Sequence, residues 1–547
     1  MKEDKFRFRK ADRIGAASAE EDAEFLRTCF INTGDWDILK NIDDHRVIVL
    51  GRTGTGKSAL LKRLGESNQR HAIVISPDDL ALTYVSNSTI LNFFAQLGVN
   101  LDPFFKLLWR HVIIVEILSH CLQDEDSAKS QNIIDKLINM FTSDDRKDKG
   151  KRQAIDYLQK WGKSFWLETE YRVKEITETL ESKLDAEVKS AIGVPGNTLA
   201  SSLNAAQSLS TEQISEIQSR AQRVVSETQV QDLNRVVELL AKVLEDKDKY
   251  YYVIVDRLDE NWVEERLRYK LIMALVATAR EFIQVRHAKV VLAMRRDLMD
   301  RVFRMTRDSG FQEEKYNSLY LPLTWAPSSL INLLAKRVSA LVAFRAKNQR
   351  PTYRDLLPKE FDRKQIDDFI TGICSTPRDI IALFNECIIA AVDQPRLTSG
   401  ILSKAVGRYS SSRLRALADE WNADFPGLID FTKILERQPK SFKLQLLSIS
   451  NVEELCLSIC SADPAASGIL HLQAMKVLDR VIAPSDFKIF LIQVFYKIGL
   501  VGLKLSPHEE ASWVEDAGRS ISTAEVTDDT SICIHPKFMR ALGIRPN

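Results

Sequence analysis

The most constraining feature of this sequence is the octapeptide Gly-Arg-Thr-Gly-Thr-Gly-Lys-Ser at positions 51–58. It matches the pattern GxxxxGK[ST] at every fixed position. Glycines let backbone amides turn inward around phosphate oxygens, the lysine adds a positive charge, and the serine hydroxyl is a ligand for Mg²⁺. An apolar strand over 46–50 precedes the motif and a helix is expected over 59–64, which is the context that phosphate binding requires. A mere glycine turn is therefore the weaker interpretation.

We predict that this loop binds a nucleoside triphosphate together with Mg²⁺. The expected nucleotide-binding residues are Gly51, Arg52, Thr53, Gly54, Thr55, Gly56, Lys57 and Ser58, and Ser58 is also an expected Mg²⁺ ligand. ATP is favoured over GTP, because the only guanine-reading candidate, Ser-Lys-Leu-Asp at 182–185, falls inside a predicted helix and not at a strand end.

A second motif, Val-Ile-Val-Asp-Arg-Leu-Asp-Glu at 253–260, places acidic residues directly after an apolar strand. Asp256 is the predicted Mg²⁺-binding acid, because a carboxylate at the end of such a strand can hold the metal's water shell next to the loop. Asp259 and Glu260 are predicted catalytic residues that orient the attacking water, with Glu260 slightly favoured for reach. Position 257 is arginine, where many related ATPases have a second acid. The alternative is a solvated acidic turn.

Two arginines are candidates for stabilising charge on the transferred phosphoryl group. Arg295 ends a predicted strand and would point toward the γ-phosphate if that strand lies between the strands of the two motifs. A surface arginine that caps a strand is the alternative interpretation. Arg378 lies in the first turn of a helix that begins at Pro377, where its charge opposes the helix dipole, so a functional reason for its position is plausible.

The periodicity of the chain predicts an α/β P-loop NTPase fold. Strands are expected over 46–50, 71–76, 250–255, 289–294 and 319–324, and their alternation with helices indicates a parallel sheet covered on both faces. We assign the ASCE-type strand order 5-1-4-3-2. The expected domains are a helical lead-in over 1–45, a P-loop core over 46–325 interrupted by a helical insertion over 88–246, a helical lid over 326–395, and a helical and winged-helix-like module over 396–547.

Within the insertion, apolar residues recur at helical spacing over 165–190 and 211–245, which indicates packing surfaces. The predicted arm over 98–246 is the expected partner contact, because these stripes exceed what a small core could cover.

Composition excludes few functions. The chain has 547 residues, a net charge of +1 and 28% charged residues, which is typical of a globular protein. It has no apolar run of the roughly 20 residues that would cross a bilayer and no apolar signal sequence at its N-terminus, so a cytoplasmic protein without a membrane partner is expected. Cys456 and Cys460 are four residues apart, a spacing that could suit a metal, but they are interpreted as core residues and no metal site of the protein itself is assigned.

The segment 394–418 has a local basic character. It contains no acidic residue and five basic ones, Arg396, Lys404, Arg408, Arg413 and Arg415. Contact with nucleic-acid phosphates is one interpretation, although the net charge does not support it. A solvated linker helix is the favoured one.

The motifs together resemble the AAA-like branch of P-loop ATPases that includes the KAP and STAND (NACHT-type) groups. Residues 256–260 are similar to the NACHT acidic signature, with Arg257 in a slot that is usually small. Met-Arg-Arg-Asp-Leu at 294–298 resembles the KAP sensor segment, and Thr-Pro-Arg-Asp at 376–379 resembles the lid arginine motif known as the second sensor. Nearly the whole chain is also similar to a bacterial set described simply as P-loop ATPases, in part through Asp-x-x-Asp-Glu-x-Trp ending at Trp262.

The resemblance implies an ATP-hydrolysing molecular switch that self-associates, and members of the wider groups often act in defence against phages. No nuclease or protease motif is evident, so an effector is expected on a partner protein. The alternative function is a DNA-dependent ATPase or loader that binds nucleic acid through 394–418 and the C-terminal module. A third is a nucleotide-binding scaffold without turnover, given Arg257.

Overall fold

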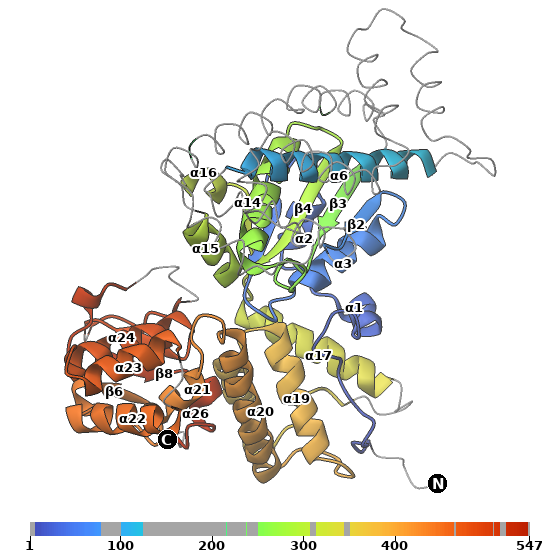
Figure 1. The fold of residues 1–547 in the computed structure, drawn as a ribbon. Helices are drawn as coiled ribbons and strands as arrows, with labels where there is room; N and C mark the ends of the chain where they lie inside the picture. Colours follow the sequence, from blue (N-terminus) through green and yellow to red (C-terminus); the bar gives the residue numbers. More distant parts are fainter. Residues whose placement is uncertain are drawn as a thin grey trace, which may run out of the picture. The chain divides into compact units, whose positions relative to one another are not determined.

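The computed structural model describes residues 6–77, 100–123, 215, 237, 250–306, 313–343, 351–463, 467–506, 508–514 and 521–544. The chain divides into two compact units, which are coloured along the sequence in Figure 1. The first, Asn32–Thr324, is called the sheet unit here. The second, called the lid unit, combines Met1–Ile31 with Trp325–Asn547, so the expected lead-in over 1–45 is shared between the two units.

The sheet unit is built on five parallel strands in the order β2-β3-β4-β1-β5, which reads 5-1-4-3-2 from the other edge. The strands lie in or beside the five expected ranges: β1 Ile48–Gly51, β2 Ala72–Ile75, β3 Tyr251–Val255, β4 Ala288–Arg295 and β5 Tyr320–Pro322. The central strands β1, β3 and β4 are buried almost throughout, as continuous apolar runs in a parallel sheet require. This parallel sheet, with the loop over 51–58 following β1, fits the expected α/β P-loop NTPase fold.

Helices cover both faces of this sheet. The helices of the unit are α2 Asp35–Lys40, α3 Lys57–Ser67, α6 Asp102–Gln123, α14 Glu265–Phe282, α15 Arg296–Met305 and α16 Glu314–Asn317. Alternate strand residues, among them Ile48 and Leu50, share one core with α6 and α14. On the other face, Gly65 of α3 lies against Ile254 of β3. The side chains of the central strands therefore alternate between two helical layers.

The first described helix of the expected insertion belongs to the core of the sheet unit. The predicted insertion over 88–246 and the predicted partner arm over 98–246 both include α6, but α6 is a core helix of the sheet unit. Trp109 is fully buried and its Nε1 donates a hydrogen bond to the Leu271 carbonyl of α14 at 2.9 Å. The apolar side of α6 therefore covers the sheet and is not free for a partner. The predicted stripes over 165–190 and 211–245 lie outside the described residues, apart from two single positions.

The lid unit begins with four helices, α17 Pro327–Ala343, α18 Arg363–Ile373, α19 Pro377–Ala390 and α20 Ser399–Glu420. The N-terminal segment lies on them and contains one short helix, α1 Ala23–Cys29, where a mostly helical segment was expected. This segment is anchored by a buried ion pair, in which Arg337 Nη2 is 2.5 Å from Asp22 Oδ2. Asn385 of α19 also accepts from the Ile14 amide and donates to the Gly15 carbonyl.

The C-terminal part of the lid unit contains a small antiparallel sheet with the order β6-β8-β7. Its elements are α21 Leu428–Phe431, η1 Thr432–Leu435, β6 Ser441–Lys443, η2 Leu444–Leu446, α22 Ile449–Ala462, α23 Ile469–Leu478, α24 Pro484–Lys497, β7 Val501–Lys504, η3 Thr523–Glu525, β8 Ser531–Ile534 and α26 Pro536–Met539. Cys456 and Cys460 of α22 are buried in its apolar core. The helices α17 to α20 share a separate apolar core, to which α20 contributes Tyr409. Helix α20 also contributes Leu414 to the core of the C-terminal part, so it belongs to both cores.

A buried ionic cluster joins these two parts of the lid unit. Asp379 of α19 is fully buried, and its carboxylate is 2.7 Å from Lys537 Nζ of α26 and 3.2 Å from Arg413 Nε of α20. Burial raises the pKa of Asp379, but the charges of Lys537 and Arg413 outweigh this effect and leave it below the ordinary value of 3.8. The cluster therefore stabilises the fold at neutral pH, and this contribution is lost as the pH falls below 3.8 through the folded pKa.

We expect Asp379→Asn to lower the free energy of unfolding by about 3–5 kcal/mol, because it leaves the buried Lys537 and the partly buried Arg413 without their counter-ion. The measurement is urea unfolding followed by circular dichroism. The matched control is Glu386→Gln, which removes the partner of the half-exposed Arg408 and should cost no more than about 1 kcal/mol. Equal losses in the free energy of unfolding would show that the buried cluster stabilises the fold no more than a surface ion pair does.

Candidate nucleotide-binding site

The phosphate-binding loop connects the end of β1 to the start of α3, as its sequence predicts. Gly54 and Gly56 have φ of +88° and +97°, a left-handed conformation that favours glycine. At Gly51, a Cβ atom would lie 2.3 Å from Thr55 Oγ1, so the tight turn excludes a side chain there. Thr55 Oγ1 closes the loop by donating a hydrogen bond to the Arg52 carbonyl at 2.9 Å. Gly54 and Gly56 are thus favoured by the backbone conformation of the loop, and Gly51 by its close approach to the Thr55 side chain.

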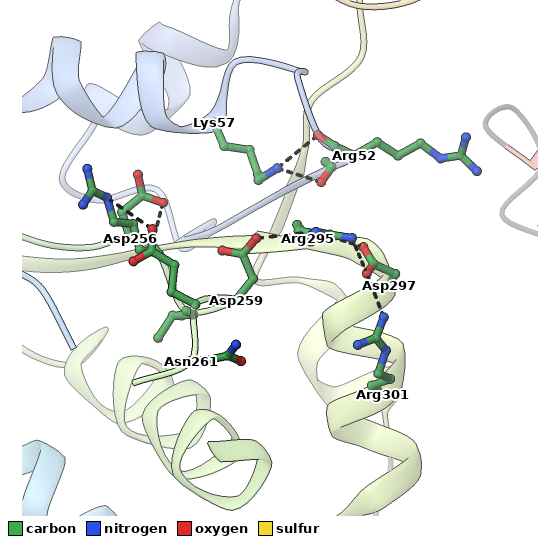
Figure 2. Close-up of polar contacts among 12 residues, drawn as sticks. Arg52, Lys57, Asp256, Asp259, Asn261, Arg295, Asp297 and Arg301 are labelled. Carbon is green, nitrogen blue, oxygen red and sulfur yellow. Dashed lines mark hydrogen bonds and ion pairs between the residues drawn. The ribbon is translucent and has the colours of Figure 1, made fainter. Parts of the chain in front are cut away.

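Lys57 lies over the mouth of this loop. Its ammonium donates hydrogen bonds of 3.0 Å to the carbonyl oxygens of both Gly51 and Arg52, while the Arg52 side chain extends away from it (Figure 2). Burial lowers the pKa of Lys57, and nearby carboxylates oppose this effect, that of Asp259 most strongly and that of Asp256 less. Among the described residues, this partly desolvated cation donates to loop carbonyls, an arrangement suited to a phosphate oxygen.

The sheet order brings the second motif to the same edge as the loop. Strand β4 lies between β1 and β3, and its last residue, Arg295, is in register with Gly51. Asp256 follows directly after the last residue of β3, and Ser58 lies in the first turn of α3. In parallel sheets, ligands bind at the carboxyl ends of the strands. Ser58 and Asp256 therefore bring side-chain oxygens, the ligands that Mg²⁺ prefers, to this edge of the sheet.

The two candidate acids differ in their surroundings. Asp259 Oδ2 is 3.6 Å from Arg295 Nη1, and its carboxylate is directed toward that guanidinium (Figure 2). Glu260 pairs instead with Arg257, at 3.7 Å, and both of these side chains are about half exposed. Asp259 is also the acid that raises the pKa of Lys57 most strongly. The catalytic roles of Asp259 and Glu260, of which the sequence slightly preferred Glu260, stay predictions.

The acidic loop is held by residues to which the sequence analysis gave no role. Arg268 of α14 is 7% exposed, and its Nη1 donates to the Glu260 carbonyl at 2.9 Å and to Asn261 Oδ1 at 2.6 Å. Arg257 has a φ of +60°, an unusual conformation for a residue other than glycine. An arginine in the otherwise apolar stripe of α14 was the only sequence signal for Arg268.

Asp297 is the second contact that sequence reasoning missed. It lies in the first turn of α15 and accepts hydrogen bonds from Arg295 Nε at 3.0 Å and Nη2 at 2.7 Å. Arg301 Nη2, one turn further along α15, is 3.4 Å from the same carboxylate. The guanidinium of Arg295 thus lies between Asp297 and Asp259. An acidic residue two positions after the arginine was the sequence feature that could have predicted this contact.

Arg378 lies in the lid unit. The helix start predicted around it is present, since the Thr376 side chain caps α19 and Pro377 is its first residue. Arg378 Nε donates to the Ala17 carbonyl of the N-terminal segment at 3.1 Å. Its role toward the nucleotide remains a prediction, because Lys57 and Asp259 belong to the other unit.

The basic segment over 394–418 forms most of α20, and part of its charge has a structural use. Arg408 pairs with Glu386 at 2.7 Å, and Arg413 belongs to the buried cluster around Asp379. Tyr409 is 1% exposed. Arg396, Lys404 and Arg415 remain at the surface. The strip available for phosphates is therefore smaller than the sequence suggests.

Other features of the described residues bear on ligands and membranes. Searching that part of the chain finds no group of three or more His, Cys, Asp or Glu side chains that could hold a metal ion. Among the helices in the same residues, none has the length and apolar character needed to cross a bilayer.

Comparisons with known proteins match both parts of the chain. Residues 328–418, which span α17 to most of α20, match the FunZ-associated C-terminal helical domain. The chain is 24% identical over 559 residues to a protein of Escherichia coli named "Putative transposon gamma-delta 80.3 kDa protein", covering 98% of this chain and 68% of that one. A solved structure, a Walker-type ATPase of Pyrococcus abyssi, aligns with a TM-score of 0.34 and 12% identity over 94% of this chain and 95% of that chain. The resemblance to the KAP and STAND groups stays a prediction.

Proposed function

We propose that this chain binds ATP with Mg²⁺ in the loop over 51–58 and hydrolyses it. The observation that carries the proposal is the meeting of Lys57, Asp259 and Arg295 at one edge of the sheet, beside a loop whose glycines are favoured by its backbone. A phosphate-binding loop alone would bind nucleotide; the acid and the second cation beside it supply the groups that hydrolysis needs.

The roles follow from the contacts. Loop amides and the first turn of α3 hold the phosphates, and Lys57 exchanges its bonds to the Gly51 and Arg52 carbonyls for phosphate oxygens. Ser58 and Asp256 would hold Mg²⁺, which when bound neutralises charge on the β- and γ-phosphates. Asp259 accepts a hydrogen bond from the attacking water and orients it, while Arg295 donates to the γ-phosphate.

A steady-state assay of the purified full chain tests this function. We expect ATP hydrolysis that requires Mg²⁺ and proceeds faster than hydrolysis of GTP. Phosphate release at the background rate with every nucleotide and divalent ion would reject the enzyme and favour the scaffold without turnover. Nucleotide binding in the same preparation, measured with a fluorescent ATP analogue, distinguishes that scaffold from a chain that does not bind nucleotide.

We further propose that nucleotide binding switches the assembly of the protein. Arg378 and the P-loop lie in different compact units, and Arg378 would reach the nucleotide of its own chain or of a neighbouring chain. Arg378 is already positioned by the capped start of α19 and by the Ala17 carbonyl. Head-to-tail self-association, rather than a two-fold dimer, follows if one chain completes the site of the next.

Sedimentation velocity tests the switch. We expect a larger species with a slowly hydrolysed ATP analogue than without nucleotide, and we expect Arg378→Gln to remain at the smaller size. Lys336→Gln, which removes another lid-unit cation that contacts the N-terminal segment, is the matched control and should assemble normally. A wild-type monomer in both states that still hydrolyses ATP would reject switching by assembly.

The alternative, a DNA-dependent ATPase or loader, is favoured by one observation. A small sheet in the order β6-β8-β7, with helices α22 to α24 before β7 and a long loop before β8, supports a winged-helix-like module. Two others oppose DNA binding there. Helix α24 is largely buried, and the sequence over 505–530 contains seven acidic residues and one basic residue. Stimulation of the ATPase by DNA, lost with rising salt, would favour this alternative.

The biological role is proposed from resemblance alone. Similarity to the KAP and STAND groups favours a switch in defence against phages, with the effector on a partner protein. The name of the Escherichia coli relative suggests instead that a transposon carries such a protein. Measuring the ATPase rate and particle size with phage lysate and, separately, with DNA distinguishes the two.

A further inference from the structure

The guanidinium of Arg295 is held from one side by a single carboxylate. Asp297 accepts hydrogen bonds from Nε and Nη2 of Arg295 through its two oxygens, so the two groups form a bidentate pair. The Asp297 side chain is 9% exposed and the Arg295 side chain 18% exposed, which limits screening by water. Asp297 also lies in the first turn of α15, where the helix dipole favours a negative charge. This pairing therefore fixes the orientation of the Arg295 fork.

This orientation places the third guanidinium nitrogen on the side of the acidic loop. With Nε and Nη2 bound to Asp297, Nη1 is the nitrogen that faces Asp259, at 3.6 Å (Figure 2). That contact is too long for a good hydrogen bond, so Arg295 is near Asp259 without binding it tightly. Asp259 consequently keeps lone pairs for another donor, such as a water molecule.

We propose that Asp297 is a positioning residue for the ATPase reaction, which rests on the proposed function. It directs one edge of the Arg295 guanidinium toward the γ-phosphate and keeps the other edge from forming a bidentate pair with Asp259. Without this carboxylate, Arg295 turns toward the nearest remaining acid, which is Asp259. Two functional groups are then lost together, because the guanidinium leaves the phosphate and the acid no longer orients water.

The same carboxylate offers a matched control. Arg301 contacts Asp297 from one turn along α15, at 3.4 Å and through one nitrogen. Replacing Arg301 removes a contact of Asp297 without changing the bidentate pair. If Asp297 served only to hold α15 in place, substitutions of Arg301 and of Arg295 would have similar effects on kcat. If Asp297 positions Arg295, substitution of Arg295 lowers kcat and substitution of Arg301 does not.

The experiment compares Asp297→Asn, Arg295→Gln, the double substitution and Arg301→Gln in the full chain. For each variant, kcat, the dissociation constant of a fluorescent ATP analogue and the melting temperature are measured. We expect Asp297→Asn to lower kcat by about 10- to 100-fold, as for other losses of catalytic orientation, while affinity changes by less than about 3-fold. The double variant should be no slower than Arg295→Gln, and Arg301→Gln should stay within about 3-fold of wild type.

The outcomes separate the inference from the function on which it rests. A wild-type rate for Asp297→Asn with an impaired Arg295→Gln overturns the positioning role and leaves the ATPase intact. Multiplying effects in the double variant, or equal losses of melting temperature in Asp297→Asn and Arg301→Gln, also overturn it. Should Asp297→Asn not fold, Asp297→Ser keeps a small hydrogen-bonding group in the first turn and has the same expected outcome. A wild-type chain without ATPase activity rejects the proposed function itself.

Discussion

Lys57→Ala is expected to abolish ATP turnover and to weaken nucleotide binding by at least about 100-fold, which corresponds to roughly 3 kcal/mol. The ammonium is the only charged group that contacts the loop carbonyls of Gly51 and Arg52 in the described structure. The measurements are phosphate release and binding of a fluorescent ATP analogue by the purified variant.

The fold should survive this substitution. The buried face of α3 consists of Leu60, Leu61 and Leu64, and Lys57 is outside it. Circular dichroism and the melting temperature should therefore match wild type closely. Lys62→Ala, in the same helix, is the control for removing a lysine and should bind nucleotide normally. Turnover near the wild-type rate in the Lys57 variant would reject the assignment of this loop.

Asp259→Asn is expected to lower kcat by about 10²–10⁴-fold while nucleotide binding survives, the usual effect of losing a general base or water-orienting acid. Asparagine has nearly the same shape and removes only the negative charge, so packing is unchanged. Glu260→Gln serves as the matched control, because its side chain is half exposed and pairs with Arg257. We expect that variant to stay within about 3-fold of the wild-type rate.

The comparison is decisive because the two acids are adjacent in sequence. If Glu260→Gln lowers kcat more than Asp259→Asn does, Glu260 orients the water, as the sequence slightly favoured. The contacts of Asp259 are then structural. If both variants hydrolyse ATP normally, neither acid orients water, and Asp256 is the only acid of consequence in this loop. A normal rate for Glu260→Gln together with a loss for Asp259→Asn is the result that the geometry predicts.

The sequence by itself determined the local elements of the site. The loop over 51–58 could be assigned because phosphate binding needs particular residues at fixed spacing, and glycine at 54 and 56 anticipates the left-handed backbone found there. Apolar runs located the five strands, and in the three central ones burial on both faces of the parallel sheet leaves no room for alternation. Thr376 and Pro377 likewise marked the start of α19, since helix caps are local interactions.

Only the tertiary structure decided which side chains meet. Asp259 and Glu260 are equivalent by spacing, and the choice between them depends on β4 lying beside β1, which brings Arg295 to one of them. The extent of the core could not be read from periodicity, because an apolar stripe such as that of α6 fits a partner as well as a sheet. The pairing of Asp379 with Lys537 joins residues 158 positions apart, and no local pattern encodes such a contact. The spacing of residues predicts local interactions, whereas contacts between residues far apart in the sequence form only when the chain folds.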